Sequence, residues 1–173
     1  EVSLMSIAGN FHDVGKLVIP NSILEKPGKL SAEEYAIIKS HTYYTYYILN
    51  SIGGMEQIAR WAAYHHEKLD GSGYPFHCRA DEIDTGSRIM AVADIFTAVS
   101  EDRPYRNGMG RNEIYKVIKK QADLKLLDKN IVELLFDNYE VIDSSVRERQ
   151  ALSQDFYERR FLSIAERCNS GMV

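Results

Sequence analysis

The sequence has little cysteine, little proline and no long apolar run, and each shortage excludes a class of protein. Its two cysteines, Cys78 and Cys168, lie far apart and match no spacing of a metal site. We therefore expect reduced thiols and a cytoplasmic location, not a disulfide framework. No stretch approaches the roughly 18 apolar residues that span a bilayer, and the first residues lack the features of a signal peptide. We expect neither a membrane segment nor a secreted, disulfide-rich protein.

An excess of positive charge is also lacking. The chain has 21 lysines and arginines against 25 aspartates and glutamates, a formal net charge of −4. Binding to duplex nucleic acid rests on a basic surface, so we expect no DNA or RNA partner. A small anionic substrate stays compatible with this charge, because it needs only a few local cations.

The apolar spacing that is present is helical. Four prolines and few alternating β-branched residues leave little room for a sheet, so we predict an all-α bundle in one domain over residues 1–173. Ser31 followed by Glu34 is a capping-box pattern that begins a helix. The glycines and proline of residues 70–75 predict a turn-rich loop. Helices are expected at residues 2–17, 31–50, 55–67, 88–100, 111–124, 128–138 and 144–168, with a loop at 19–30.

Histidines and an aspartate occur where these helices should be apolar. His41 falls on the apolar face of its helix, together with Ile37. His65 and His66 fall on the apolar face of the next helix. Asp94 interrupts an otherwise apolar helix, where an unpaired carboxylate would be very costly. These side chains need a common reason for facing inward.

His12 and Asp13 close the first helix and complete the set. A single core histidine is usually just hydrogen-bonded, and a buried aspartate such as Asp94 is more often a packing acceptor. Four histidines and two aspartates that face inward from separate helices are better explained by a shared metal cluster. The cation offsets the carboxylates, and the imidazole nitrogens act as ligands. Such ligands without thiolate suit iron, manganese and zinc alike.

Several motifs occur in an order that resembles one family. They are FHDVGK at residues 11–16, HHE at 65–67, DGSGYP at 70–75, and RIMAVADIF with EDRPYR ending at 106. Together they resemble the HD-GYP family, a branch of the HD superfamily of metal-dependent phosphohydrolases, over residues 12–106. The resemblance implies an all-α HD-domain helical bundle. It also implies hydrolysis of cyclic di-GMP to linear pGpG and, in some members, onward to GMP.

The same resemblance assigns roles to individual residues. It implies iron or manganese, two or three ions per site, with zinc also compatible. Asp13 would bridge two ions, and Lys16, one turn further on, would act in catalysis by steadying the phosphate or the attacking water. The implied metal ligands are His12, Asp13, His41, His65, His66 and Asp94.

Three further residues are candidates, beside Lys16, for binding the substrate. Arg103 and Arg106 can present guanidinium groups to phosphates, and an exposed loop with ion pairs explains them equally well. Tyr74 can stack on a guanine or seal its loop, and loop packing is the stronger interpretation. The expected partner is a cyclic dinucleotide, with a diguanylate cyclase as a further candidate.

Two departures from the family pattern limit what carries over. Thr97 stands where the family has a second aspartate, so a substrate or metal contact from that position is in doubt. The family also takes an early histidine, and often a glutamate, from a helix before the HD motif. We expect that helix to be absent, because the chain begins eleven residues before His12. An apolar face left uncovered there would favour a homodimer near residues 1–15.

Two alternatives stay open beside a cyclic di-GMP phosphodiesterase. One is an HD phosphohydrolase for another nucleotide, against which the GYP loop and the additional histidines argue. The other is a catalytically weak module that binds a signal or a protein partner. The intact Lys16 and metal ligands favour catalysis, whereas the expected absence of the first helix favours the module.

Overall fold

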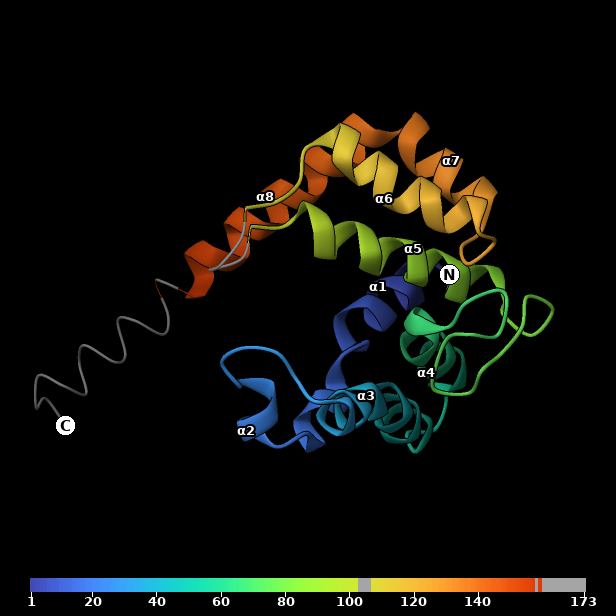
Figure 1. Ribbon diagram of the computed structural model, residues 1–173, viewed down its shortest axis with the longest axis vertical. Helices are drawn as coiled ribbons and strands as arrows, with labels where there is room; N and C mark the ends of the chain where they lie inside the picture. The colour runs from blue at the N-terminus through green and yellow to red at the C-terminus, as the bar shows by residue number, and fades with distance from the viewer. Residues whose placement is uncertain (103–106, 158, 160–173) are drawn as a thin grey trace, which may run out of the picture.

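The structure, a computed structural model, describes residues 1–102, 107–157 and 159. Within them the chain forms eight α-helices and two short 3₁₀ helices, and the only pairing of β type is an isolated bridge between Asp70 and Arg79. The predicted all-α fold is confirmed. None of the described helices is long and apolar enough to cross a membrane. The elements are α1 (Val2–Phe11), η1 (Val14–Val18), α2 (Asn21–Leu24), α3 (Ala32–Asn50), α4 (Glu56–Ala63), η2 (Tyr64–His66), α5 (Thr85–Ser100), α6 (Arg111–Asp123), α7 (Lys129–Asp137) and α8 (Tyr139–Tyr157) (Figure 1).

Helix α5 lies between the two halves of the bundle (Figure 1). Helices α6 and α7 pack against it on one side and α4 with η2 on the other, while α1 and α3 pack against α4. Its side chains enter both apolar cores. Met90 belongs to the core built with α1, α3 and α4, and Phe96 to the core built with α6 and α7. Asp94, between these two residues, is therefore held where the two halves meet.

Helix α3 begins as the sequence predicts. The backbone N–H of Glu34 donates to Ser31 Oγ (3.2 Å), and the backbone N–H of Ser31 donates to Glu34 Oε2 (2.7 Å), which is the reciprocal capping box. The inner face is more polar than predicted, because Ile37 is 41% exposed. The buried residues of α3 are His41, Thr42, Thr45 and Leu49.

Several boundaries differ from the prediction. The first helix ends at Phe11 instead of residue 17, because the chain turns there and continues as η1. His65 and His66 lie in η2, a tight turn after α4, instead of in a continuous α-helix. The four-residue helix α2 interrupts the predicted loop at 19–30. Helix α8 begins at Tyr139 instead of residue 144, and its predicted end at 168 lies outside the described residues.

Candidate metal centre

The turn after α1 delivers the first two side chains of the site. His12 directly follows the helix, and its Nδ1 is 2.7 Å from the carbonyl oxygen of Gly9, one turn back. A carbonyl only accepts, so Nδ1 carries the proton and Nε2 keeps a lone pair. Asp13 then begins η1, which carries Lys16 back toward the same carboxylate.

Thr45 and Gly15 hold this turn in contact with α3. The buried hydroxyl of Thr45 donates to the carbonyl oxygen of His12 (3.0 Å) and accepts from the backbone N–H of Gly15 (3.0 Å). A Cβ on Gly15 would lie 1.9 Å from the carbonyl oxygen of His41, closer than any two such atoms can approach. Only glycine at position 15 lets η1 rest directly on α3.

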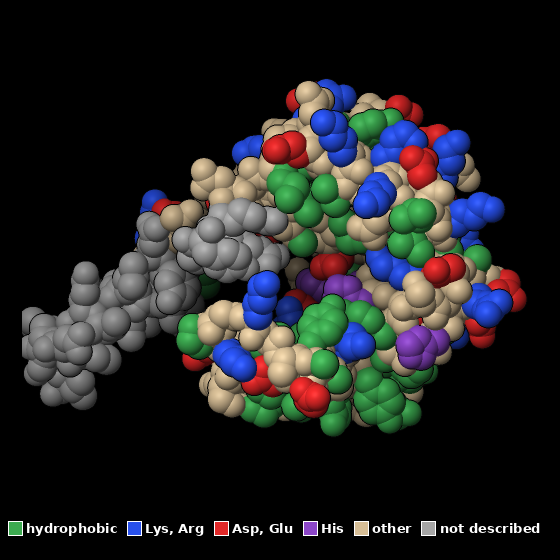
Figure 2. All heavy atoms as spheres, in the orientation of Figure 1, with side chains coloured by type: hydrophobic (Ala, Val, Ile, Leu, Met, Phe, Trp, Pro, Cys, Tyr) green, Lys and Arg blue, Asp and Glu red, His purple; other side chains and the backbone are tan. Residues whose placement is uncertain are grey.

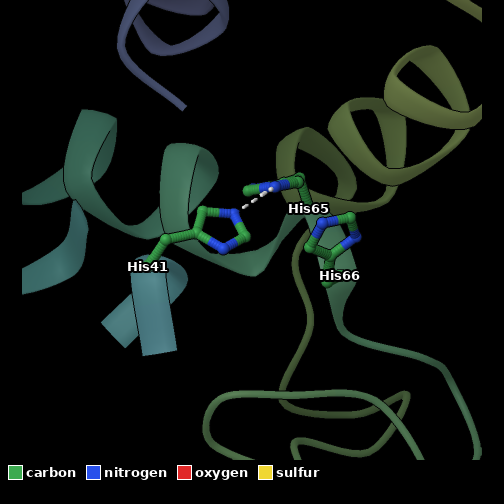
Figure 3. Close-up of side chains that lie close together, drawn as sticks. All are labelled: His41, His65 and His66. Carbon is green, nitrogen blue, oxygen red and sulfur yellow. Dashed lines mark hydrogen bonds between the residues drawn. The ribbon is translucent and has the colours of Figure 1, made fainter. Parts of the chain in front are cut away.

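His41 and His65 face each other across the site (Figure 3). Nδ1 of His41 is 2.7 Å from the carbonyl oxygen of Ile38, and Nδ1 of His65 is 2.6 Å from that of Ala62. The same carbonyl argument leaves both Nε2 atoms with lone pairs, yet these atoms are only 3.4 Å apart. Two lone pairs at this distance repel, so a proton or a cation must lie between them.

Two carboxylates and His66 close the cluster. His41 Nε2 is 3.2 Å from Asp13 Oδ1, and His12 Nε2 is 3.7 Å from Asp94 Oδ1. His66 Nδ1 is 3.7 Å from Asp94 Oδ2. The structure thus brings together all six side chains that the resemblance implies as ligands. Figure 2 shows histidine and acidic side chains in a hollow between the two halves of the molecule.

The donor set fits divalent metal ions. Ligand atoms of His41, His65 and His66 all lie within 4.8 Å of one another, as do those of His12, His65 and Asp94. Atoms bound to one ion at about 2.1 Å lie about 3–4 Å apart, close to the separations found here. Neutral imidazole nitrogens held by backbone carbonyls, together with carboxylates, form a site that an ion would complete.

Burial keeps His65 and His66 neutral. It holds the pKa of His65 well below its ordinary value, and it lowers the pKa of His66 to about 3. Burial alone would raise the pKa of Asp13, but the adjacent His41 and Lys16 side chains hold it below its ordinary range. Burial raises the pKa of Asp94. At neutral pH His65 and His66 therefore offer lone pairs, and Asp13 offers a negative charge.

Of the other predicted site residues, the structure describes Lys16 and Tyr74. The Lys16 ammonium pairs with Asp13. The ring of Tyr74 lies 4.9 Å from that of His66, centre to centre, so this loop residue reaches the edge of the cluster. Arg103 and Arg106 lie outside the described residues.

The groups of possible metal ligands include neither Thr97 nor His77. The hydroxyl of Thr97 donates to the carbonyl oxygens of Ala93 and Asp94, so it is engaged by its own helix. His77 is exposed at a loop position with φ of 58°, outside the cluster.

Glu67 is a residue whose role the sequence reasoning missed. Its side chain is buried and accepts backbone N–H groups from Phe76 (2.7 Å), His77 (3.1 Å) and Cys78 (3.1 Å). It thereby ties the loop that carries Tyr74 to the backbone that carries the adjacent histidines. A signal was available, because an acidic residue directly after two inward histidines precedes a loop with many unpaired amides.

Comparisons with known proteins indicate the family. A family model described as HD domain matches residues 2–131. The chain is 38% identical over 160 residues to 3'3'-cGAMP-specific phosphodiesterase 1 of Vibrio cholerae, covering 92% of this chain and 33% of that protein. It is 39% identical over 134 residues to a cyclic di-GMP phosphodiesterase of Thermotoga maritima, covering 76% of this chain and 36% of that protein.

Another similar protein is the Xanthomonas campestris cyclic di-GMP phosphodiesterase response regulator RpfG, 37% identical over 137 residues, with 78% of this chain and 36% of that protein covered. The chain thus spans about a third of the length of these three relatives. Over that span the motifs, the helices and the cluster of histidines and aspartates occur together. The chain belongs to the HD domain family, and its motifs and relatives place it in the HD-GYP branch of that family.

Proposed function

We propose that this chain is the catalytic part of a metal-dependent phosphodiesterase that hydrolyses cyclic dinucleotides. The observation that carries the proposal is the convergence of imidazole lone pairs and two carboxylates in one hollow. Burying such a set in an ordinary core is costly, whereas divalent cations would bind its lone pairs and offset its carboxylates.

The residues take separate roles in this proposal. The proposed ligands are His12, Asp13, His41, His65, His66 and Asp94. Asp13 lies beside His12, His41 and Lys16 and would hold an ion together with the histidines. Iron or manganese, two or three ions per site, is the proposed occupant, with zinc also compatible with the donors. When bound, the ions would supply Lewis acidity toward water and the phosphoryl oxygens.

Lys16 is the proposed catalytic cation of the chain itself. Its ammonium pairs with Asp13, beside the hollow, and the Lys16 side chain is 44% exposed. From there it can steady negative charge that develops on a phosphoryl oxygen. Tyr74, Arg103 and Arg106 are proposed to contact the substrate, the tyrosine through its ring and the arginines through charge-assisted hydrogen bonds.

Cyclic di-GMP is the substrate that we propose first, with linear pGpG as the initial product and GMP as the further one. Relatives named for 3'3'-cGAMP make that molecule the second candidate. The two cyclic dinucleotides differ in one purine base, so the same metal centre serves both. A diguanylate cyclase partner and a homodimer stay predictions.

The test combines metal analysis with product analysis. Protein loaded separately with iron, manganese and zinc is incubated with cyclic di-GMP and with 3'3'-cGAMP, and the products are separated by chromatography. We expect at least two bound ions per chain and release of a linear dinucleotide. Tight binding of either molecule without any product would support the alternative of a signal-binding module. A protein that neither binds nor cleaves either cyclic dinucleotide would refute the proposed role.

A further inference from the structure

Lys39 and Tyr35 lie beside the metal centre, next to Tyr74, and have no role in the chemistry proposed so far. Lys39, on α3, holds its ammonium 5.5 Å from the ring centre of Tyr35 and 5.6 Å from that of Tyr74. Tyr35 lies one helical turn before Lys39, and Tyr74 comes from the loop after η2. Two segments far apart in the sequence thus meet around one ammonium group.

This group is continuous with the metal centre. The ring of Tyr74 contacts both the Lys39 ammonium and the ring of His66. Tyr35 is 51% exposed, so the surface opens to solvent at its outer end. One aromatic ring therefore separates Lys39 from a proposed metal ligand.

Lys39 differs from other lysines of the chain in its partners. The Lys16 ammonium pairs with Asp13, and the Lys26 ammonium pairs with Glu34 at 2.7 Å. For Lys39 the described part of the chain supplies the two tyrosine rings and no carboxylate. A cation held on ring faces keeps its N–H donors available to an anion.

The substrate class supplies such an anion at the required place. A cyclic dinucleotide carries two phosphates on opposite sides of its ring, and only one can lie among the metal ligands at a time. The other must lie at the edge of the hollow, where a cation would offset its charge. We propose that Lys39 binds the phosphate that is not being hydrolysed, with Tyr35 and Tyr74 holding its ammonium in place. This inference rests on the proposed function and adds a residue that selects dinucleotides over single phosphodiesters.

The test uses a substrate with two phosphates and one with a single phosphate. Lys39→Met keeps the apolar stem and removes the charge. We expect its KM for cyclic di-GMP to rise by about tenfold or more, as for loss of one charge-assisted contact. Turnover of bis(p-nitrophenyl) phosphate, which has one phosphate, should stay unchanged. The Kd for a hydrolysis-resistant phosphorothioate analogue of cyclic di-GMP, measured by calorimetry, should rise by the same factor.

Two matched variants control for charge and for position. Lys39→Arg keeps a cation at the site and should keep the wild-type Kd within about threefold, as expected if charge dominates over geometry. Lys116→Met makes the same change of net charge on the exposed face of α6, away from the cluster. It should leave KM and turnover unchanged with both substrates.

The outcomes separate this inference from the proposed function. Unchanged binding of the analogue by Lys39→Met overturns the inference while wild-type turnover leaves the function standing. An equal loss of activity toward both substrates in Lys39→Met also overturns the inference, since Lys39 would then act on the metal centre or the fold. A wild-type protein that cleaves bis(p-nitrophenyl) phosphate but neither binds nor cleaves cyclic dinucleotides would refute the function, and this inference with it.

Discussion

His65 belongs to both groups of side chains that could hold an ion, whereas His66 and Asp94 each belong to one. We therefore expect His65→Ala to lose more metal than His66→Ala or Asp94→Ala, and all three to lose hydrolysis while the helices stay folded. Elemental analysis beside circular dichroism measures both effects. His77→Ala, an exposed histidine outside the cluster, is the matched control and should keep its metal. Unchanged metal in the three cluster variants would contradict the ligand assignment.

Substitution of Lys16 should lower the rate of catalysis without lowering the metal content. An ammonium is no metal ligand, so Lys16→Ala should keep its metal, while turnover falls by roughly two orders of magnitude, as for loss of one electrostatic contact in the transition state. The measurements are kcat with cyclic di-GMP and metal content by elemental analysis. Lys116→Ala should leave both unchanged. A loss of metal equal to that of Asp13→Ala would show that Lys16 serves mainly to hold Asp13.

At the scale of elements, the contact between η1 and α3 depends on one missing methyl group. Gly15→Ala places a Cβ 1.9 Å from the carbonyl oxygen of His41, so the two elements must separate. We expect a loss of about 1–3 kcal/mol in the free energy of unfolding, as for overpacking, together with weaker metal binding. Urea denaturation and metal titration measure these changes.

Gly9 provides the matched control for this substitution. A Cβ there meets nothing within 4 Å, and the residue lies inside α1. Gly9→Ala should therefore stabilise the protein by about 0.5–1 kcal/mol, because alanine loses less backbone entropy in a helix. A similar destabilisation by both variants would show that the close approach of η1 and α3 is not the reason for glycine at position 15.

The start of α7 gives a prediction about pH. Asp128 Oδ1 accepts from the backbone N–H groups of Asn130 (2.9 Å) and Ile131 (3.4 Å), and Arg88 Nη1 donates to its Oδ2 (2.9 Å). Burial alone would raise the pKa of Asp128, but these bonds hold it below its ordinary value. Because the pKa of the folded state is lowered, this stabilisation is present above about pH 4 and is lost as the pH falls through the lower value.

The substitution Asp128→Asn tests this direction of the pH dependence. The amide oxygen can still cap α7, so the variant removes mainly the charge. We expect it to cost about 1–2 kcal/mol of unfolding free energy at pH 7, and less at pH 3. Urea denaturation at the two pH values measures the difference. A cost that stays constant or grows at low pH would mean that the ionised carboxylate does not stabilise the fold.

The sequence predicts most elements because local signals mark them. The capping box of Ser31 and the apolar periodicity of α3 and α5 lie within single segments, and the structure confirms these helices. The turn after Phe11 was missed, because its cause is a close contact with α3, thirty residues away. The role of Glu67 was missed although its three partners, backbone amides nine to eleven residues further on, follow it closely in the chain. Periodicity reports which face is buried, but not which atoms meet there.

At the scale of the whole molecule, the proposed ligands come from both halves of the bundle. His12, His41 and His65 belong to the half built from α1, α3, α4 and η2, whereas Asp94 belongs to α5, which packs on α6 and α7 as well. The His41–His65 contact is repulsive without a proton or cation. A bound ion should therefore stabilise the first half directly and fasten it to α5.

Removal of metal should accordingly loosen the molecule unevenly. An ion that binds only the folded state stabilises it by about 2.7 kcal/mol at a free concentration of one hundred times its Kd. We expect a chelator to lower Tm by several degrees, and hydrogen exchange to quicken in α1, η1 and η2 but not in α6 and α7, whose core is apolar and contains none of these ligands. His65→Ala should show little further change with the chelator. Uniform loosening of all helices, or none, would mean that the cluster does not hold the two halves together.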